Sequence, residues 1–349
     1  MFARRTSYFV TLIFLLSPML LLAGGQQEGG DEENTIHVYS HRHYEADQRL
    51  YERFTEETGI EVQVVEAGAD ELIQRLAAEG ESSPADVLMT VDAGRLFRAK
   101  DTGLLQPVES EVLSDNIPVH LRDEDRHWFG LTKRARIIAH HADRVSPDDL
   151  STYQALAEER WDDRIAVRSS SNIYNISLMS AAIAHYGEEA AREWAAGVVD
   201  NMARPPQGND RDQLRAVAAG VADVAIVNTY YIALMRTSDD PDEREVGESV
   251  RVFFPNQETT GAHVNVSGAG VTASADNVSG AVRFIEFLTS SEAQEVFAQQ
   301  NHEYPIRDDV EPSDTVAAFG EYTEDSLPLS ELGRNSRQAT RIFDEVGWE

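Results

Sequence analysis

The sequence lacks cysteine altogether and has only two lysines, Lys100 and Lys133, among its 30 basic residues. The absence of cysteine excludes a disulfide framework, a thiolate zinc site, an iron–sulfur cluster and a cysteine nucleophile. Positive charge is also scarce, because 61 Asp and Glu stand against 30 Lys and Arg and give a formal net charge of −31. This excess of negative charge opposes binding to a phosphate backbone, so a nucleic-acid partner is not expected.

The acidic residues are spread along the whole chain rather than gathered in one tail. Such a spread is typical of a solvated acidic surface, as in proteins kept soluble at high salt, and it is equally expected of an acidic, arginine-rich proteome. Hydrophobic residues make up 42% of the 349 positions, which is enough for real cores. The length favours two domains of ordinary size.

The N-terminus has the parts of an export signal. Arg4 and Arg5 provide a positive start, residues 8–23 form an almost unbroken apolar run, and small residues follow. We therefore predict that residues 1–25 are a signal peptide. Its removal would change the net charge from −31 to −33, because two arginines and no acids are lost. The apolar run is too short to favour a permanent membrane anchor.

The position where a bacterial lipoprotein signal carries its cysteine is occupied by Gly25. This glycine excludes lipid attachment at that point. Residues 26–34 are polar and glycine-rich, and we expect them to form a flexible lead-in. Because no later stretch is apolar enough to span a membrane, we expect a soluble mature protein outside the cytoplasm.

From residue 35 onward, short apolar runs typical of strands alternate with longer amphipathic segments typical of helices. This alternation favours a parallel sheet covered by helices. Strands are predicted at 36–39, 61–65, 86–90, 128–139, 164–167, 224–227 and 264–272. Helices are predicted at 47–57, 70–78, around Leu96 and Phe97, and at 173–186, 190–199, 213–219, 278–288 and 293–300.

Two long strand-like segments, 128–139 and 264–272, bracket an inserted α/β unit. This arrangement predicts two α/β lobes joined by two crossover strands, with a ligand cleft between the lobes. The expected boundaries are 35–130 plus 266–315 for the first lobe and 131–265 plus 316–349 for the second.

Several tyrosines lie where the periodicity does not explain them. Tyr44 follows the first strand, Tyr230 and Tyr231 follow the strand at 224–227, and Tyr174 lies in a polar turn that opens a helix. Open α/β sheets bind ligands at the carboxyl ends of their strands. A single tyrosine at such a point is more often a packing residue, but three separate loops that each present phenols indicate a ligand site.

A more specific signal comes from the order and spacing of seven short segments: 39–44, 83–88, 132–136, 168–175, 206–210, 228–231 and 254–257. Together they resemble the periplasmic ferric-iron-binding proteins of bacterial ABC importers. The similarity is greatest to the cyanobacterial type, which binds iron without a carbonate, and it covers essentially all of residues 35–349.

This resemblance implies a type II periplasmic-binding-protein fold, two-lobed and transferrin-like, that closes on one iron ion. It also implies an inner-membrane ABC permease as partner, a periplasmic location and a monomer. Arg204 resembles an arginine that lies behind the metal ligands in the family, whereas Arg42 and Arg134 lie in matching segments without an assigned position. The implied metal ligands are His43, Tyr44, Tyr174, Tyr230 and Tyr231.

The chemistry of these side chains agrees with Fe(III). Phenolate is a hard anionic ligand for a hard trivalent cation, whereas zinc sites favour His and Cys. A free phenol has a pKa of about 10, so binding at neutral pH requires the metal to supply roughly 4 kcal/mol per tyrosine. Four phenolates, a neutral imidazole and Fe³⁺ sum to −1, which a guanidinium such as that of Arg204 could neutralise.

Other interpretations stay open. His41, where relatives commonly have a small polar residue, could add a ligand or favour zinc, and the serine turn at 169–171 with nearby arginines could hold a small anion. A secreted metal-dependent hydrolase using His41 and His43 is a further alternative, although no carboxylate stands at metal-ligand spacing. The sequence contains no HExxH, GxSxG or P-loop motif, and we do not expect an enzyme.

Overall fold

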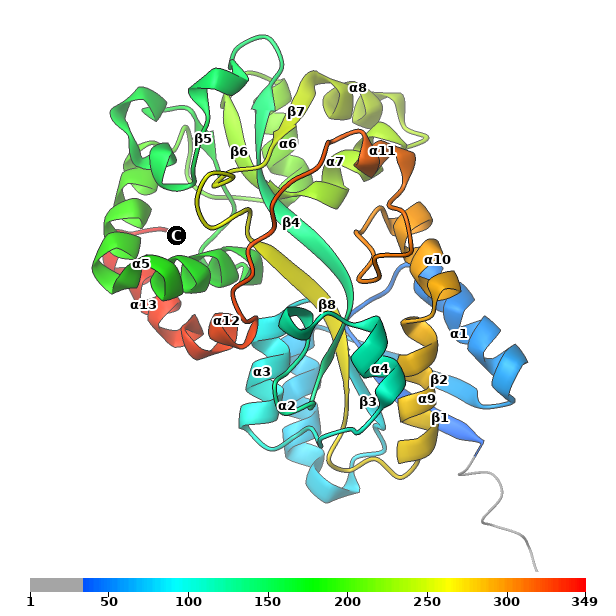
Figure 1. Ribbon diagram of the computed structural model, residues 1–349. Coiled ribbons are helices and arrows are strands. Elements are labelled where there is room, and N and C mark those ends of the chain that lie inside the picture. The colour runs from blue at the N-terminus through cyan, green and yellow to red at the C-terminus, as the bar shows by residue number, and fades with distance from the viewer. Residues whose placement is uncertain (1–33) are drawn as a thin grey trace, which may run out of the picture.

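The structure, a computed structural model, describes residues 34–349. It consists of two α/β lobes that share one sheet, as Figure 1 shows. The predicted signal peptide at 1–25 and the predicted lead-in up to residue 33 lie outside the described residues. None of the helices in residues 34–349 combines the length and the apolar character that a membrane span needs.

The sheet has eight strands in the described part of the chain, in the order β2-β1-β3-β8-β4-β6-β5, with β7 paired to β4 beside that path. Strands β1, β2 and β3 are parallel, as are β5 and β6, whereas β4 and β8 run against their neighbours. The expected parallel sheet is therefore a mixed one. The strands are β1 Thr35–Ser40, β2 Glu61–Glu66, β3 Val87–Thr90, β4 Phe129–His141, β5 Ile165–Ala166, β6 Val224–Asn228, β7 Val250–Phe253 and β8 Val264–Val271.

Strands β4 and β8 join the lobes, which confirms the predicted pair of crossover strands. The first half of β4 pairs with β8, and its second half pairs with β6 and β7. Every residue of β8 is buried. A Cβ at Gly268 would lie 2.5 Å from the carbonyl oxygen of Phe129, so this close approach of the two crossing strands requires glycine.

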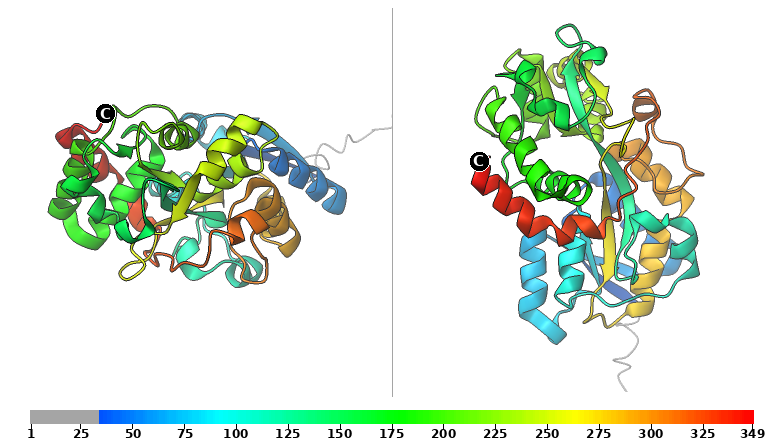
Figure 2. Two further views of the ribbon diagram at one scale, coloured as in Figure 1. Left: turned by 90° about the horizontal axis from the view of Figure 1, so that it is seen from above. Right: turned by 60° about the vertical axis from the view of Figure 1, so that its left-hand side comes forward.

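Helices cover both faces of the sheet in each lobe (Figures 1 and 2). Lobe 1 contains β1 to β3 with α1 Glu45–Thr58, α2 Ala69–Glu79, α3 Ala93–Asp101, α4 Glu111–Asn116, α9 Val278–Leu288 and α10 Ser291–Asn301. Lobe 2 contains β5 to β7 with α5 Ile173–Asp200, α6 Asp210–Ala218, α7 Thr229–Arg236 and α8 Pro241–Ser249. The remaining helices are α11 Asp314–Ala317, α12 Ser330–Arg334 and α13 Ser336–Val346.

The C-terminal helices return to the boundary between the lobes, where Figure 2 shows them in red beside α5. Helix α12 contacts both α3 of lobe 1 and α5 of lobe 2, and α13 packs along α5. A Cβ on Gly333 would lie 2.3 Å from the Phe97 ring, so α12 rests closely on α3. The residue boundaries of the lobes that the sequence suggested stay a prediction.

Each lobe has its own hydrophobic core. In lobe 1 the core includes Phe54, Trp128 and Phe284, all fully buried. Lobe 2 has two clusters, and the adjacent β4 residues Ile137 and Ile138 fall in different ones. Because successive residues of a strand point to opposite faces, these two clusters lie on the two sides of the sheet.

The predicted strands and helices are all present, with ends shifted by a few residues. The predicted helices 173–186 and 190–199 form one element, α5, interrupted at Gly187, whose φ of 83° is outside the helical range. The sequence analysis missed α4, α7, α8, α11, α12, α13 and β7. All of these except α13, which has 11 residues, are nine residues long or shorter, so their periodic signal is weak.

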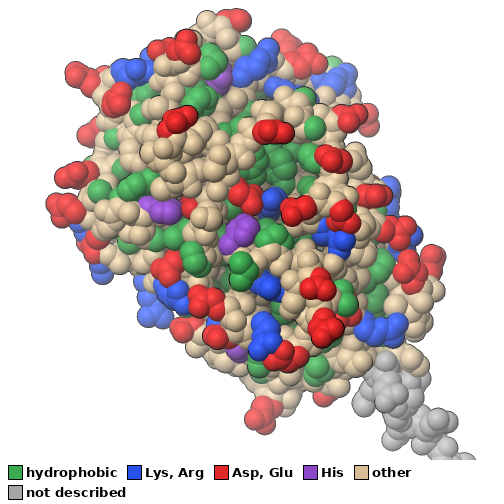
Figure 3. All heavy atoms as spheres, in the orientation of Figure 1, with side chains coloured by type: hydrophobic (Ala, Val, Ile, Leu, Met, Phe, Trp, Pro, Cys, Tyr) green, Lys and Arg blue, Asp and Glu red, His purple; other side chains and the backbone are tan. Residues whose placement is uncertain are grey.

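The surface carries the excess acid. Figure 3 shows Asp and Glu side chains scattered over the face it displays, with Lys and Arg between them. Many arginines pair with an acid one turn away on the same helix, as Arg53 does with Glu57 at 3.0 Å. Exposed pairs of this kind stabilise the fold by less than about 1 kcal/mol each, so most of the negative charge remains simply solvated.

Candidate metal centre

A cleft of about 480 Å³ lies between the lobes and is lined from both. Its walls are the end of β1 and the starts of α1 and α3 in lobe 1, and the starts of α5, α6 and α7 in lobe 2. Four of the five predicted ligands, His43, Tyr44, Tyr174 and Tyr231, line this cleft. The fifth, Tyr230, is only 4% exposed and packs against Tyr231, with ring centroids 4.2 Å apart.

The wall from lobe 1 is built where β1 turns into α1. The side-chain oxygen of Ser40 accepts a hydrogen bond from the backbone N–H of Arg42 at 3.0 Å, which starts the turn. Tyr44 then forms the N-cap of α1, and its N–H donates to the carboxylate of Asp47 at 3.1 Å. The turn therefore fixes the backbone of Tyr44 directly before the first residue of α1.

His43 is exposed and stacks on Tyr44, with ring centroids 5.4 Å apart and an interplanar angle of 15°. Its Nδ1 lies 3.3 Å from the carbonyl oxygen of His41. A carbonyl can only accept, so Nδ1 carries the proton and donates. Nε2 is consequently the nitrogen left to act as a ligand.

The wall from lobe 2 is built from two helix starts. Tyr174 is the second residue of α5, where the side chain of Asn172 accepts a hydrogen bond from the Tyr174 N–H at 3.1 Å. Tyr230 and Tyr231 are the second and third residues of α7. The hydroxyl oxygens of Tyr174 and Tyr230 are 3.3 Å apart, so the two helix starts meet at their phenols.

All four tyrosines therefore lie at helix N-termini, as the sequence predicted for Tyr174 but not for Tyr230 and Tyr231. The N-terminal end of a helix carries partial positive charge from its unpaired N–H groups, and it favours anions by about 0.3–1 kcal/mol. Three helix starts that converge on one cleft favour the deprotonated form of the phenols.

Three of the phenols, those of Tyr44, Tyr230 and Tyr231, are nevertheless harder to ionise than a free phenol. Burial raises the pKa of Tyr44 to about 12, and the nearby Glu303 carboxylate adds to this rise. Burial raises the pKa of Tyr230 well above its usual value, and the neighbouring phenols Tyr174 and Tyr231 raise it further. Burial also raises the pKa of Tyr231. A ligand that deprotonates these groups must therefore carry a high positive charge.

Three guanidiniums surround Tyr174. The central carbons of Arg134, Arg136 and Arg168 lie 5.4, 5.7 and 5.6 Å from the centre of its ring. A single carboxylate, that of Asp210, pairs with Arg136 at 2.7 Å and with Arg168 at 3.1 Å. This half of the site thus has a local excess of positive charge.

One guanidinium, that of Arg42, lies 5.3 Å from the ring of Tyr44. It is fully buried and pairs with Asp47 and with Glu303, at 2.9 Å in each case. Four guanidiniums therefore lie near the phenols, and three carboxylates pair with those of Arg42, Arg136 and Arg168 but not with that of Arg134. One unit of positive charge remains, which matches the −1 of four phenolates, a neutral imidazole and Fe³⁺.

The structure does not bring Arg204 to the tyrosines. Its guanidinium donates to the carbonyl oxygen of Asp212 at 3.2 Å and to the side chain of Gln213 at 3.1 Å, and it lines a different hollow beside α6. Arg134, in contrast, lies 5.4 Å from the centre of the Tyr174 ring and has no carboxylate within ion-pair distance among residues 34–349. The role predicted for Arg204 stays a prediction.

Sequence reasoning missed Arg136, Arg168, Asp210 and Glu303. The first three fall within the segments that carried the family resemblance, so a signal was available for them. Glu303 lies in no such segment, and it meets Arg42 across 261 positions of sequence. Only the fold brings that pair together.

His41 lines the cleft beside His43. Burial and the nearby Arg95 lower the pKa of His41 to about 4, so its imidazole is neutral at physiological pH. Its Nδ1 has no hydrogen-bond partner among the described residues. In residues 34–349, no three His, Asp or Glu side chains are grouped so that they could hold a metal.

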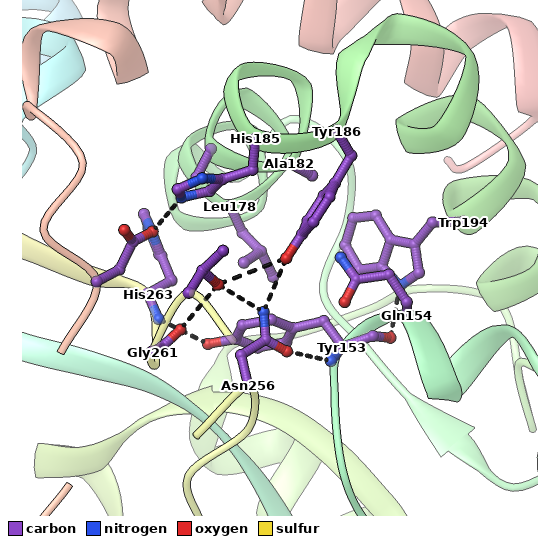
Figure 4. Close-up of a pocket in the computed structure, with 13 residues that line it drawn as sticks. Tyr153, Gln154, Leu178, Ala182, His185, Tyr186, Trp194, Asn256, Gly261 and His263 are labelled. Carbon is purple, nitrogen blue, oxygen red and sulfur yellow. Dashed lines mark hydrogen bonds and ion pairs between the residues drawn. The ribbon is translucent and has the colours of Figure 1, made fainter. Parts of the chain in front are cut away.

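A second pocket, shown in Figure 4, lies between α5 and the loop that precedes β8, and its lining includes His185, Tyr186 and His263. Its volume of about 20 Å³ is room for roughly one water molecule, so it is too small for a transported solute. The backbone N–H of His263 donates to the hydroxyl of Tyr153 at 3.1 Å, and its carbonyl accepts from the N–H of Arg136 at 2.8 Å.

The two lobes, the paired crossing strands and the cleft are those of a type II solute-binding protein. The chain belongs to the bacterial extracellular solute-binding protein family, which matches residues 49–324. It is 50% identical to iron uptake protein A1 of Synechocystis over 318 residues, which is 91% of this chain and 88% of the relative.

Solved structures agree with this assignment. The Trichodesmium protein FutA (IdiA), in complex with iron and citrate ligands, is 46% identical with a TM-score of 0.88, covering 90% of this chain and all of that one. A ferric binding protein from Campylobacter jejuni is 44% identical with a TM-score of 0.87, again over 90% and 100% of the two chains. The resemblance to ferric-iron-binding proteins is confirmed.

Proposed function

We propose that this protein binds Fe(III) in the cleft between its lobes and delivers it to an ABC permease for iron uptake. It acts in the periplasm, as a binding protein and not as an enzyme. The ligands in this proposal are the imidazole Nε2 of His43 and the phenolates of Tyr44, Tyr174, Tyr230 and Tyr231.

The observation that carries the proposal is the convergence of the phenols. The hydroxyl oxygens of Tyr174 and Tyr230 lie 3.3 Å apart, and Tyr44 and Tyr231 are close enough to influence the pKa of Tyr230. Four phenols in one cleft provide hard oxygen ligands that suit Fe³⁺. The relatives that are named for iron uptake, and one solved with iron and citrate, support the same solute.

Binding proceeds from lobe 2 to lobe 1. Tyr174, Tyr230 and Tyr231 lie on adjacent helix starts of lobe 2, and they capture the ion first. Approach of lobe 1 then adds His43 and Tyr44. Each phenol whose pKa is raised releases its proton to the solvent as its oxygen binds the metal, because a trivalent cation stabilises the phenolate. The surplus guanidinium charge offsets the resulting negative complex.

The visible spectrum tests the proposal. Metal-free protein mixed with ferric citrate should develop a coloured band from phenolate-to-iron charge transfer. Tyr230→Phe and Tyr231→Phe should each weaken or shift that band, whereas Tyr186→Phe, which alters a tyrosine outside the cleft, should leave it unchanged. A spectrum that is the same in all three variants contradicts the ligand assignment.

No observation in the described residues favours the alternatives. The zinc and hydrolase interpretations need a group of conventional ligands around His41 and His43, and no group of three is present in residues 34–349. In the serine turn, the hydroxyl of Ser169 lies 2.9 Å from that of Ser171, so these side chains bond to each other. Calorimetry with Zn²⁺ and phosphate provides the comparison with Fe³⁺.

A further inference from the structure

A small cavity lies beside Tyr174, which also lines the cleft. Its volume is about 10 Å³, close to the minimum that holds one water-sized particle. Its walls come from the crossing strands β4 and β8 and from the ends of β6 and α5. The lining residues are Arg134, Arg136, Tyr174, Asn228, His263 and Asn265.

The walls of this cavity carry hydrogen-bond donors that lack acceptors. The Nε of Arg134, the Nε of Arg136 and the Nδ2 of Asn228 have no partner among residues 34–349. Each of these three residues is only 2% exposed. A buried donor without a partner costs roughly 1–3 kcal/mol, and more when it is charged. Three such donors around one cavity indicate that an acceptor belongs there.

The charge at the cavity is also uncompensated. Arg134 donates to the hydroxyl of Ser267 at 3.2 Å and to the carbonyl oxygen of Val91, and no carboxylate of the described residues lies within ion-pair distance of it. Asp92 and Glu303 act on it only from farther away. Arg136 shares its one carboxylate, Asp210, with a second guanidinium. Of the two buried guanidiniums that line the cavity, that of Arg134 has no paired carboxylate and that of Arg136 has one that it shares.

We propose that this cavity is a binding site for one monatomic halide, chloride under ordinary conditions. A halide is a single negatively charged atom that accepts hydrogen bonds from several donors at once. A water molecule accepts only about two hydrogen bonds, so it would leave one of the three free donors without a partner and would not compensate the charge of the guanidiniums. Sulfate, phosphate and carboxylates are too large for a volume of about 10 Å³.

This site differs from any anion site in the metal cleft. Tyr174 is the one residue that lines both spaces, and the side chains that bear the free donors line only the cavity. The proposal concerns the metal-free protein and does not depend on which metal the cleft binds.

Diffraction tests the site directly. Crystals of the metal-free protein grown with sodium bromide in place of sodium chloride should give an anomalous peak in the cavity, between the Nε atoms of Arg134 and Arg136. Density without an anomalous signal, at full bromide exchange, means that water occupies the cavity and overturns the proposal.

A solution measurement supplies the variants. The midpoint of thermal unfolding should rise more with sodium chloride or bromide than with sodium sulfate of equal ionic strength, because a ligand bound only by the folded state stabilises it. The difference in midpoint should level off once the cavity is fully occupied. Asn228→Asp places a carboxylate oxygen where the free donor was, so it should abolish the difference.

Asn301→Asp is the matched control for that variant. Asn301 also has a buried, unpartnered Nδ2 but lies on α10, outside the cavity. It should therefore keep the full difference between halide and sulfate. A difference that Asn228→Asp retains, or that both variants lose, contradicts the assignment to this cavity.

One consequence rests on the proposed function. Iron binding makes Tyr174 a phenolate beside the cavity, and this negative charge should weaken the binding of a halide there. By linkage, chloride should weaken iron binding by the same factor as iron weakens chloride binding. The apparent iron affinity should fall several-fold from sulfate to chloride at equal ionic strength, and Asn228→Asp should remove that dependence. Failure of iron to bind at all would contradict the proposed function while leaving the bromide result intact.

Discussion

The two walls of the cleft present similar aromatic groups in different electrostatic surroundings. In lobe 1, Tyr44 lies over one guanidinium, that of Arg42, which two carboxylates already neutralise. In lobe 2, Tyr174 lies among three guanidiniums that share a single carboxylate. The immediate surroundings of the lobe 1 phenol are thus slightly negative, and those of the lobe 2 phenol are positive.

This difference assigns different tasks to the two walls. The guanidiniums beside Tyr174 suit lobe 2 to form the first bond to the ion, whereas burial raises the pKa of Tyr230 and Tyr231 as it raises that of Tyr44. Lobe 1 contributes Tyr44, whose ionisation the Glu303 carboxylate opposes. Tyr44 therefore binds well only to a metal ion that is already held in the cleft. The order of binding proposed above follows from this contrast between the walls.

The largest effect we expect is that of pH, because it acts on both walls. The pKa of Tyr44 is about 12, and those of Tyr230 and Tyr231 are also raised. These groups are protonated at neutral pH in the metal-free protein, so metal binding must release their protons and must weaken as the pH falls. We expect at least three protons per Fe(III), or about three decades of affinity per pH unit.

Calorimetry in buffers of different ionisation enthalpy measures this proton release. Tyr230→Phe should lower the number by one. A release of fewer than two protons in the native protein contradicts phenolate coordination by both walls.

The next effect compares one phenol from each wall. Tyr174→Phe should weaken Fe(III) binding by more than about 100-fold, since outer partners of metal ligands alone are worth 10- to 100-fold. Tyr44→Phe should cost roughly 10-fold, because its phenolate lies in less favourable surroundings. Competition with a chelator of known affinity measures both. Equal losses would break the proposed contrast between the walls.

The sequence predicted the fold and the tyrosines for reasons that the structure makes clear. Strand and helix periods persist over whole elements, and the tyrosines stand at strand and helix ends. The positive half of the site was not predictable in the same way, because a buried arginine looks like a surface arginine in a sequence. Arg136 reaches Asp210 across 74 positions, and nothing local marks either as buried.

The surroundings of Arg204 were not predictable for a related reason. Its place just before the segment at 206–210 gave no information about which way its side chain turns, and it turns toward α6. Helix α7 was missed because its second and third residues, Tyr230 and Tyr231, were assigned to a loop. The positions of the tyrosines at the cleft were thus easier to predict than the side chains around them.

A smaller effect should come from the cations of lobe 2. Arg168 is half-buried and lies 5.6 Å from the centre of the Tyr174 ring, so Arg168→Gln removes positive charge from that wall with limited disturbance to the core. We expect about a 10-fold loss of Fe(III) affinity. Arg211→Gln is the control, because Arg211 lines the cleft but pairs only with Glu243, at 3.9 Å. If both variants lose affinity alike, only the net charge of the cleft matters.

The smallest effect should come from His41, a cleft residue of lobe 1 at which this sequence departs from the family pattern. Four phenolates and His43 already satisfy a trivalent hard cation, and a further neutral imidazole is a softer ligand that adds no charge. His41→Ser should therefore change Fe(III) affinity by less than about 3-fold while it reduces any Zn²⁺ binding, because zinc prefers imidazole. Parallel titrations with the two metals separate these outcomes. A loss of Fe(III) affinity beyond about 10-fold would place His41 among the ligands, and lobe 1 would then contribute as much to capture as lobe 2.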